Sequence, residues 1–391
     1  MFKITQKHLA ATFIPPFIMS TVFFVVFLLT FQLLRLTRII ISKGVDFLVV
    51  LKLIGHICMT FLPMAIPLSA LFATIYTLNK LSEDSEIVAM RSFGLSKFTI
   101  FKPFLILGLA TAMALFSLNM QLIPTAKRAF KNEIIRLTSK GVLADIRPEH
   151  FFTEIPGITL FAEKVSTEGD KLENVFINVN SKGGSEERVI FAKFGHLIKK
   201  SLDKNKTPTL RMHLSDGNIV KSFKDKPEVE KIIFQEYDFP IFEAGLDPGF
   251  VNKDSMLGMN KLSLVIKNYK KKISSIKEKG LLAATDNRIL QETSKDLDKA
   301  LIEYWSRVNT PLQVIIFIFL GFSLGIKKGR GKAKNMGPIG LFILLGYYTL
   351  FFLGVSLSKK GLLHPAVSVF LPSLVAFVLA KRFYNRLDWL G

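Results

Sequence analysis

"LIGHICMTFLPMAIPLSALFATIYTLN", residues 53–79, contains no Lys, Arg, Asp or Glu. An α-helix rises about 1.5 Å per residue, so about 20 apolar residues cross a hydrocarbon core that is about 30 Å thick. Five further runs of at least 18 residues share this lack of charge: 17–34, 103–126, 308–326, 335–358 and 361–380. Of the 391 residues, 49% are hydrophobic, and the mean hydropathy is +0.35. The sequence therefore predicts six transmembrane helices.

A long polar segment separates the third run from the fourth. The chain thus divides into three spans at 1–126, an inserted domain at 127–306 and three spans at 307–391. Between about 149 and 240, alternating stretches such as "ITLFAEKV" and "LENVFINV" are separated by turn signals such as "EGDK" and "SKGGSE", which is typical of antiparallel strands. Residues 260–306 return to helical spacing. We predict an α-helical integral membrane protein with an inserted all-β domain, resembling a jelly roll or a sandwich, and flanking helices.

Basic residues near the span ends indicate how the chain crosses the membrane, because short loops rich in Lys and Arg stay in the cytoplasm. Both chain ends and the segment 80–102 carry such residues, and "KKGRGKAKN" at 327–335 has five of them and no acid. With six spans, all of these fall on one side. We expect both termini to be cytoplasmic and the inserted domain to be periplasmic, if the organism is a Gram-negative bacterium.

One basic cluster breaks this pattern, because it falls on the non-cytoplasmic side after the first span. It contains Arg35, Arg38 and Lys43. These side chains can reach lipid headgroups as ordinary snorkelling residues, or they can bind an anionic amphiphile through its phosphate oxygens. Lys127 and Arg128, at the outer end of the third span, leave the same two interpretations open: general juxtamembrane charge, or part of the same binding site.

The motifs of common catalytic sites are missing. No phosphate-binding loop, HExxH, GxSxG or paired-cysteine motif occurs, and "GIKKGRGKA" at 325–333 ends in Ala333 where a magnesium-binding loop needs Ser or Thr. The six charge-free runs contain no acid that could relay protons or cations. We therefore expect no catalytic residue, metal or cofactor in this chain, and energy for any uphill transport must come from a partner.

The polar segment "NKLSEDSEIVAMRSFGLSK", residues 79–97, predicts a short helix over 82–94. Ser82 can cap its start, and Gly94 can end it in a left-handed conformation. Acids in the first turn suit the positive end of the helix dipole. These acids are Glu83, Asp84 and Glu86.

This predicted helix is amphipathic, because Ile87, Met90 and Gly94 share one face. One interpretation is an interfacial helix that rests on lipid. The other is a helix docked in a groove of a cytoplasmic protein, which fits the apolar strip and the acids together.

Three stretches resemble the LptF/LptG permeases of the lipopolysaccharide export system. "LSEDSEIVAMRSFGLS" at 81–96 resembles the coupling helix of that family, with its acid-rich start, Ser-Glu pair, Met and Gly. "NTPLQVIIFIFLGFSLGI" at 309–326 resembles its fourth span, and "GYYTLFFLGVSLSKKGLLHPAVSVFLPSLVAF" at 346–377 resembles its last two. The order of three spans, β domain and three spans is also that of the family.

The resemblance implies a permease subunit of the bacterial inner membrane that pairs with a second LptF/LptG-type permease. A cytoplasmic ABC ATPase dimer would use ATP and Mg²⁺ to drive lipopolysaccharide into a periplasmic jelly-roll bridge protein. By analogy, Glu86 would pair with a basic residue of the ATPase and Met90 would pack in its groove. Arg35, Arg38 and Lys43 lie where the family places cations that line the lipid cavity. The "SLSKKG" ending with its following "HP" favours the F-type, and we expect no nucleic-acid partner.

Three other classes of protein remain as alternatives. Other ABC-type permeases, which export lipoproteins or amphiphiles such as macrolides, typically place a very large domain after the first span, whereas here the insertion follows the third. A membrane sensor with a ligand-binding β domain needs a cytoplasmic output domain, and no cytoplasmic segment here is long enough. A membrane-embedded enzyme would need clustered His, Asp, Glu or Ser in its spans.

Overall fold

The computed structural model describes residues 2–42, 46–145, 148–152, 158–166, 171–180, 186–200, 209–223, 226–240, 254–278, 284–326 and 337–387. The chain forms two compact units. The helical unit comprises residues 1–35, 54–126 and 253–391, and the β unit comprises 36–53 and 127–252.

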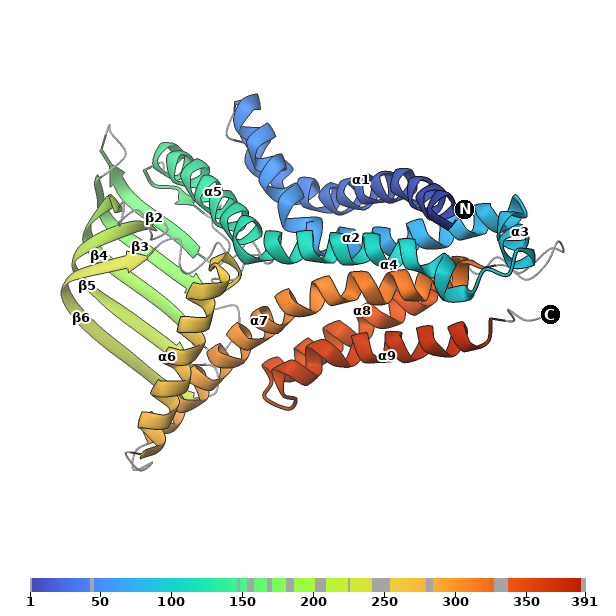
Figure 1. The fold of residues 1–391 in the computed structure, drawn as a ribbon. Coiled ribbons are helices and arrows are strands. Elements are labelled where there is room, and N and C mark those ends of the chain that lie inside the picture. The colour runs from blue at the N-terminus through green and yellow to red at the C-terminus, as the bar shows by residue number, and fades with distance from the viewer. Residues whose placement is uncertain are drawn as a thin grey trace. The chain divides into compact units, whose positions relative to one another are not determined.

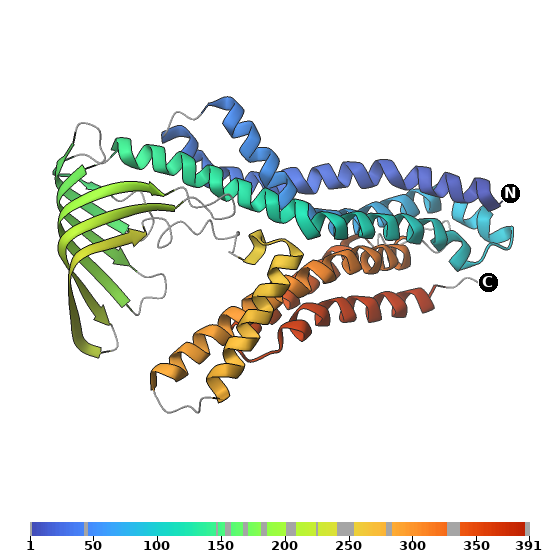
Figure 2. The same cartoon turned by 60° about the vertical axis from the view of Figure 1, so that its left-hand side comes forward.

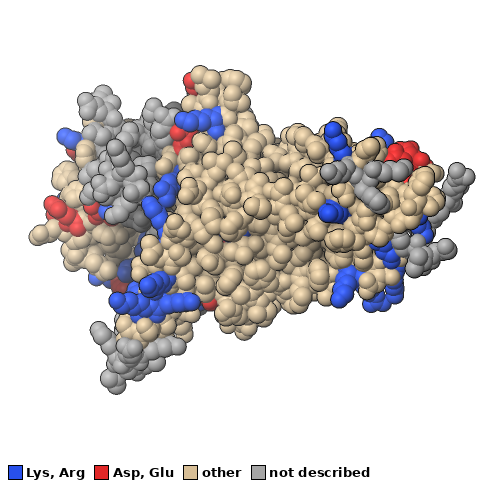
Figure 3. All heavy atoms as spheres, in the orientation of Figure 1, with Lys and Arg blue, Asp and Glu red and all other residues tan. Residues whose placement is uncertain are grey.

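Among the residues that the structure describes, six helices are long and apolar enough to cross a membrane, which confirms the predicted number of spans. They are formed by α1 (Phe2–Ser42), α2 (Phe47–Glu83), α4 (Lys97–Ser117) with its continuation into α5 (Ile123–Asp145), α7 (Ala284–Gly325), α8 (Gly337–Lys359) and α9 (Pro365–Asn385). A short helix, α3 (Glu86–Ser92), joins α2 to α4, and α6 (Met259–Glu278) precedes α7. Figure 1 shows α3 at the same end of the helical unit as the two chain ends; we call this the α3 end. Figure 3 shows a broad band of surface without charged side chains between clusters of charge.

Two glycines of α7 allow it to approach α2 closely. A Cβ atom on Gly321 would lie 2.9 Å from the carbonyl oxygen of Leu71, and one on Gly325 would lie 3.2 Å from the Cα of Ile75. The glycines are four residues apart, so they share one face of the helix. Small residues at this spacing bring helix backbones together in membranes, where van der Waals packing drives association.

A buried hydrogen-bond network joins α7, α8 and α9. Ser373 Oγ of α9 donates to Asn309 Oδ1 of α7 at 2.8 Å and lies 3.0 Å from the Tyr347 hydroxyl of α8. Asn309 Nδ2 donates to the Val369 carbonyl at 3.2 Å, and Gln313 Nε2 donates to the Tyr347 hydroxyl. A polar group inside a membrane protein needs such a partner, because lipid offers none.

The described part of the inserted segment contains one antiparallel sheet, which confirms the predicted β domain. Its strands are β1 (Phe151–Phe152), β2 (Ile158–Val165), β3 (Lys171–Asn180), β4 (Glu186–Lys200), β5 (Thr209–Phe223) and β6 (Lys226–Pro240). Among the described residues each strand pairs with its neighbour in the sequence, so the order is β1-β2-β3-β4-β5-β6 in a single sheet. Figure 2 shows the curvature of this sheet.

The two faces of the sheet differ because side chains alternate along each strand. One face is a buried core that includes Leu160, Ile177 and Ile190. On the other face, cross-strand register aligns four phenylalanines in a row: Phe151, Phe161, Phe176 and Phe191. The Phe176 and Phe191 ring centroids are 5.3 Å apart.

Residues 254–278 and 284–306 belong to the helical unit. Leu262 and Ile266 of α6 form a buried cluster with Ala300 of α7. The buried guanidinium of Arg307 donates to the carbonyl oxygen of Ser255 at 3.1 Å. It thereby fixes the 3₁₀ turn Asp254–Met256 to α7.

Candidate functional site

The short helix begins later than the sequence predicted. Helix α2 continues to Glu83, and Ser82 lies inside it with its hydroxyl donating to the Leu78 carbonyl at 2.6 Å. The prediction that Ser82 is an N-cap is therefore wrong, because its hydroxyl is used within α2. The backbone N–H of Asp84 donates to the Lys80 carbonyl at 2.9 Å. Glu83 and Asp84 consequently lie at the end of α2 and not in the first turn of α3.

A turn at Ser85 separates α2 from α3. Ser85 has a φ of 62°, in the left-handed region, and its side chain makes no capping hydrogen bond. Glu86 then occupies the first turn of α3, as predicted, where an acid suits the helix dipole.

The end of α3 follows the predicted pattern. Gly94 has a φ of 75°. Its N–H donates to the Arg91 carbonyl at 2.9 Å, and the Leu95 N–H donates to the Met90 carbonyl at 3.2 Å. These two bonds form a Schellman motif, which needs a residue that tolerates positive φ. The left-handed conformation predicted for Gly94 is confirmed.

The apolar strip of α3 faces the chain's own core. Ile87 is 1% exposed and Met90 is 9% exposed, and both belong to a buried cluster with Leu9 and Phe13 of α1. The expectation that Met90 fills a groove of a partner needs correction, because its side chain already packs inside this chain. Val88 of α3 and Phe93, the residue that ends the helix, are exposed, with Phe93 at 74%.

Glu86 has a partner within the chain that the sequence did not indicate. Its Oε2 lies 2.9 Å from Nε2 of His8 in α1, and both side chains remain partly exposed. The two residues are far apart in the sequence and lie on different helices, so no local spacing pattern could reveal the contact. The contact fixes the start of α3 beside α1.

The segment after α3 connects this region to the end of α9. Ser96 caps α4, since its Oγ accepts from the Thr99 N–H at 3.2 Å. The Lys97 ammonium donates to the Leu387 carbonyl and lies 5.7 Å from the centroid of the Tyr384 ring. The α3 end is therefore a packed assembly of α1, α3, α4 and α9.

The predicted basic cluster is only partly described. Arg35 and Arg38 belong to α1, but their side chains, and all of Lys43, lie outside the described residues. Lys127 and Arg128 belong to α5, and both are half-buried and interact with other groups of the chain. A joint cation site formed by these five residues stays a prediction.

The family described as lipopolysaccharide export system permease LptF/LptG matches residues 7–386. The chain is 24% identical over 367 residues to the lipopolysaccharide export system permease protein LptF of Escherichia coli K12, covering 92% of this chain and 89% of that protein. The LptF protein of Shigella flexneri gives the same values. The match over nearly the full length shows that this multi-pass inner-membrane protein belongs to the LptF/LptG family of lipopolysaccharide export permeases.

Proposed function

We propose that the chain is the F-type permease subunit of an ABC transporter that extracts lipopolysaccharide from the inner membrane. In this proposal a second, G-type permease completes the lipid cavity, and a periplasmic jelly-roll protein receives the lipid. The F-type assignment is supported by the LptF relatives. The chain binds no cofactor itself, and a separate cytoplasmic ATPase dimer uses ATP and Mg²⁺.

The α3 segment is the observation that carries the coupling to an ATPase. It presents the partly exposed carboxylate of Glu86 together with the exposed side chains of Val88 and Phe93. Aromatic anchors dominate many protein-binding hot spots, and a carboxylate beside such an anchor can pair with a basic residue of the partner. Because Ile87 and Met90 anchor the helix in the chain's own core, a push on α3 is transmitted directly to α1 and α4. In this proposal the exposed side chains contact the ATPase, and the buried side chains transmit its movement to the membrane helices.

The orientation of the chain follows the distribution of basic residues. The proposal places the α3 end and both termini in the cytoplasm, where an ATPase can reach Glu86. It places the β unit in the periplasm. The predicted cations then lie at the periplasmic surface of the inner membrane, where the lipid A phosphates of lipopolysaccharide would pair with them. These cations are Arg35, Arg38, Lys43, Lys127 and Arg128.

Reconstitution tests this function. The chain, a G-type permease and the ATPase are placed in lipopolysaccharide-containing proteoliposomes, and transfer to a soluble jelly-roll acceptor is measured by photo-crosslinking. We expect transfer only when ATP and Mg²⁺ are both present and only with all subunits. Transfer without this chain, or equal transfer without ATP, would contradict the proposal.

A further inference from the structure

We propose that a groove between α4, α7 and α9 binds an anionic phospholipid of the membrane leaflet at the α3 end. The groove has a volume of about 870 Å³ and lies within the helical unit. This inference does not depend on the transport function proposed above.

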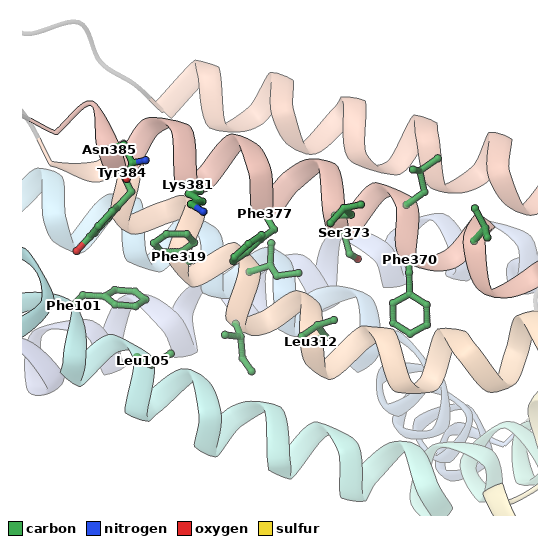
Figure 4. Close-up of a pocket in the computed structure, with 15 residues that line it drawn as sticks. Phe101, Leu105, Leu312, Phe319, Phe370, Ser373, Phe377, Lys381, Tyr384 and Asn385 are labelled. Atoms are coloured by element: carbon green, nitrogen blue, oxygen red, sulfur yellow. The ribbon is translucent and has the colours of Figure 1, made fainter.

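The groove has the length and the surface of an acyl-chain site. On α9 its lining extends from Val367 to Asn385, a distance of roughly 27 Å at 1.5 Å per residue. This is nearly the thickness of a hydrocarbon core, about 30 Å, so a chain from one leaflet would occupy about half of the groove. The walls are aliphatic and aromatic side chains of all three helices (Figure 4).

An aromatic cluster forms one wall near the α3 end. Phe319 of α7 lies at its centre. The centroid of its ring is 5.6 Å from the ring centroid of Phe101, 6.0 Å from that of Phe377 and 5.4 Å from that of Tyr384. These side chains come from α4, α7 and α9, so the cluster holds the three helices at fixed separation. The wall is therefore preformed, which lowers the entropy cost of binding a flexible chain.

Charge is present at only one end of the groove. Lys381, Tyr384 and Asn385 line the α3 end, and no Asp or Glu lines any part of the groove that the structure describes. Lys381 is exposed and makes no hydrogen bond or ion pair with the described part of the chain. Lys97 brings a second cation beside the Tyr384 ring. Apolar walls that end in cations and hydrogen-bond donors match a phospholipid with a negative headgroup.

The side chains of the groove argue against a transmembrane helix as the occupant. Helices pack closely in membranes through Gly, Ala and Ser, as Gly321 and Gly325 do against α2. In the groove the smallest lining residue is Ser373, and its hydroxyl donates to Asn309. Large Phe and Leu side chains leave irregular space that a flexible acyl chain can fill.

Native mass spectrometry of the full chain, purified with the subunits that it retains, tests the site. Phosphatidylglycerol and phosphatidylethanolamine with identical acyl chains are added, and bound lipid is counted for each variant. We expect Lys381→Ala to lower phosphatidylglycerol binding about fivefold and to leave phosphatidylethanolamine unchanged, as expected for one lost cation near an anionic headgroup. Arg382→Ala, which removes a neighbouring cation that does not line the groove, is the control and should change neither.

A second pair of variants tests the acyl-chain wall. Leu374→Trp narrows the groove and should displace both lipids, whereas Val378→Trp, an exposed position of α9 outside the lining, should displace neither. Equal effects of Lys381→Ala and Arg382→Ala, or no effect of Leu374→Trp, would overturn the proposal. Loss of a bound polypeptide or of lipopolysaccharide, in place of phospholipid, in the Leu374→Trp variant would also overturn it.

Discussion

The imidazole Nε2 of His8 lies 2.9 Å from the carboxylate Oε2 of Glu86, so the start of α1 holds the start of α3. Both side chains remain partly exposed, with 51% of His8 and 37% of Glu86 accessible. The carboxylate therefore keeps room for a second partner while its position is set within the chain. This arrangement separates two roles of Glu86 that experiments can distinguish.

Glu86→Ala should lower the amount of ATPase that co-purifies with the permease by about tenfold, because a hydrogen bond to a charged group contributes about 1.5–3 kcal/mol. His8→Ala removes only the partner within the chain and should leave co-purification within about twofold, a loss of roughly 0.4 kcal/mol. Quantitative pull-down and ATP turnover measure both variants. If the two substitutions weaken the complex equally, Glu86 only positions α3 and does not contact the ATPase.

Phe93→Ser should also weaken the ATPase complex by about tenfold or more, since truncating a buried aromatic anchor of an interface typically costs at least about 1–2 kcal/mol. Phe93 is 74% exposed in the isolated chain, so the change should leave folding intact. Leu362→Ser is the matched control, because Leu362 is 72% exposed in the turn between α8 and α9, at the opposite end of the helical unit. Titration of ATPase binding in detergent measures both, and equal losses would exclude Phe93 from the interface.

The α3 segment shows which features of a helix a local sequence pattern can predict. The stop at Gly94 was predictable because a Schellman motif needs one residue with positive φ, and glycine is the usual choice. The start of the helix was not predictable, because Ser82 and Ser85 are both acceptable N-caps. A Ser inside a helix can also donate its hydroxyl to the carbonyl four residues earlier, as Ser82 does. An amphipathic pattern also cannot tell whether its apolar face is covered by the same chain or by a partner.

The membrane spans show the same division between composition and packing. Their number follows from charge-free runs of sufficient length. Which spans pack against each other does not follow from these runs. The run 308–326 contains Gly321 and Gly325, for example, but nothing in it indicates which helix approaches them. In the β unit, the alternation of apolar and polar residues predicted antiparallel strands. It did not predict that each strand pairs with the next one in a single sheet, because that depends on contacts between separate segments.

Gly321→Ala should destabilise the helical unit by about 1–3 kcal/mol, the usual cost of overpacking. The added methyl group would press on the backbone of α2, where the Leu71 carbonyl oxygen leaves no space. Gly346→Ala is the control, because a Cβ at Gly346 meets no atom within 4 Å. Thermal unfolding in detergent should show a lower midpoint for Gly321→Ala only, and equal midpoints would contradict the close α2–α7 contact.

Ser373→Ala should destabilise the contact of α9 with α7 and α8, because it leaves Asn309 Oδ1 without its donor in a buried site. Side-chain hydrogen bonds between membrane helices contribute about 0.6 kcal/mol on average and up to about 1.7 kcal/mol. Thr349→Ala is the matched control, since that exposed hydroxyl donates only to the Leu345 carbonyl of its own helix. The same unfolding assay should show a larger shift for Ser373→Ala, and a larger shift for Thr349→Ala would contradict the network.

Neutralising Arg35 and Arg38 together, as Gln, should reduce crosslinking of lipopolysaccharide to a photoreactive residue at Leu34, whose side chain is 69% exposed. Each cation near an anionic membrane surface contributes about 1 kcal/mol, so we expect a loss of about tenfold or more. Lys359→Gln with Lys360→Gln is the control, because these two lysines lie at the turn between α8 and α9, which the proposed orientation places on the same membrane side. General attraction of lipopolysaccharide to surface charge predicts equal losses for both pairs. A loss confined to the Arg35 and Arg38 pair assigns these residues to the lipid cavity, since only a specific site distinguishes two equal changes in charge.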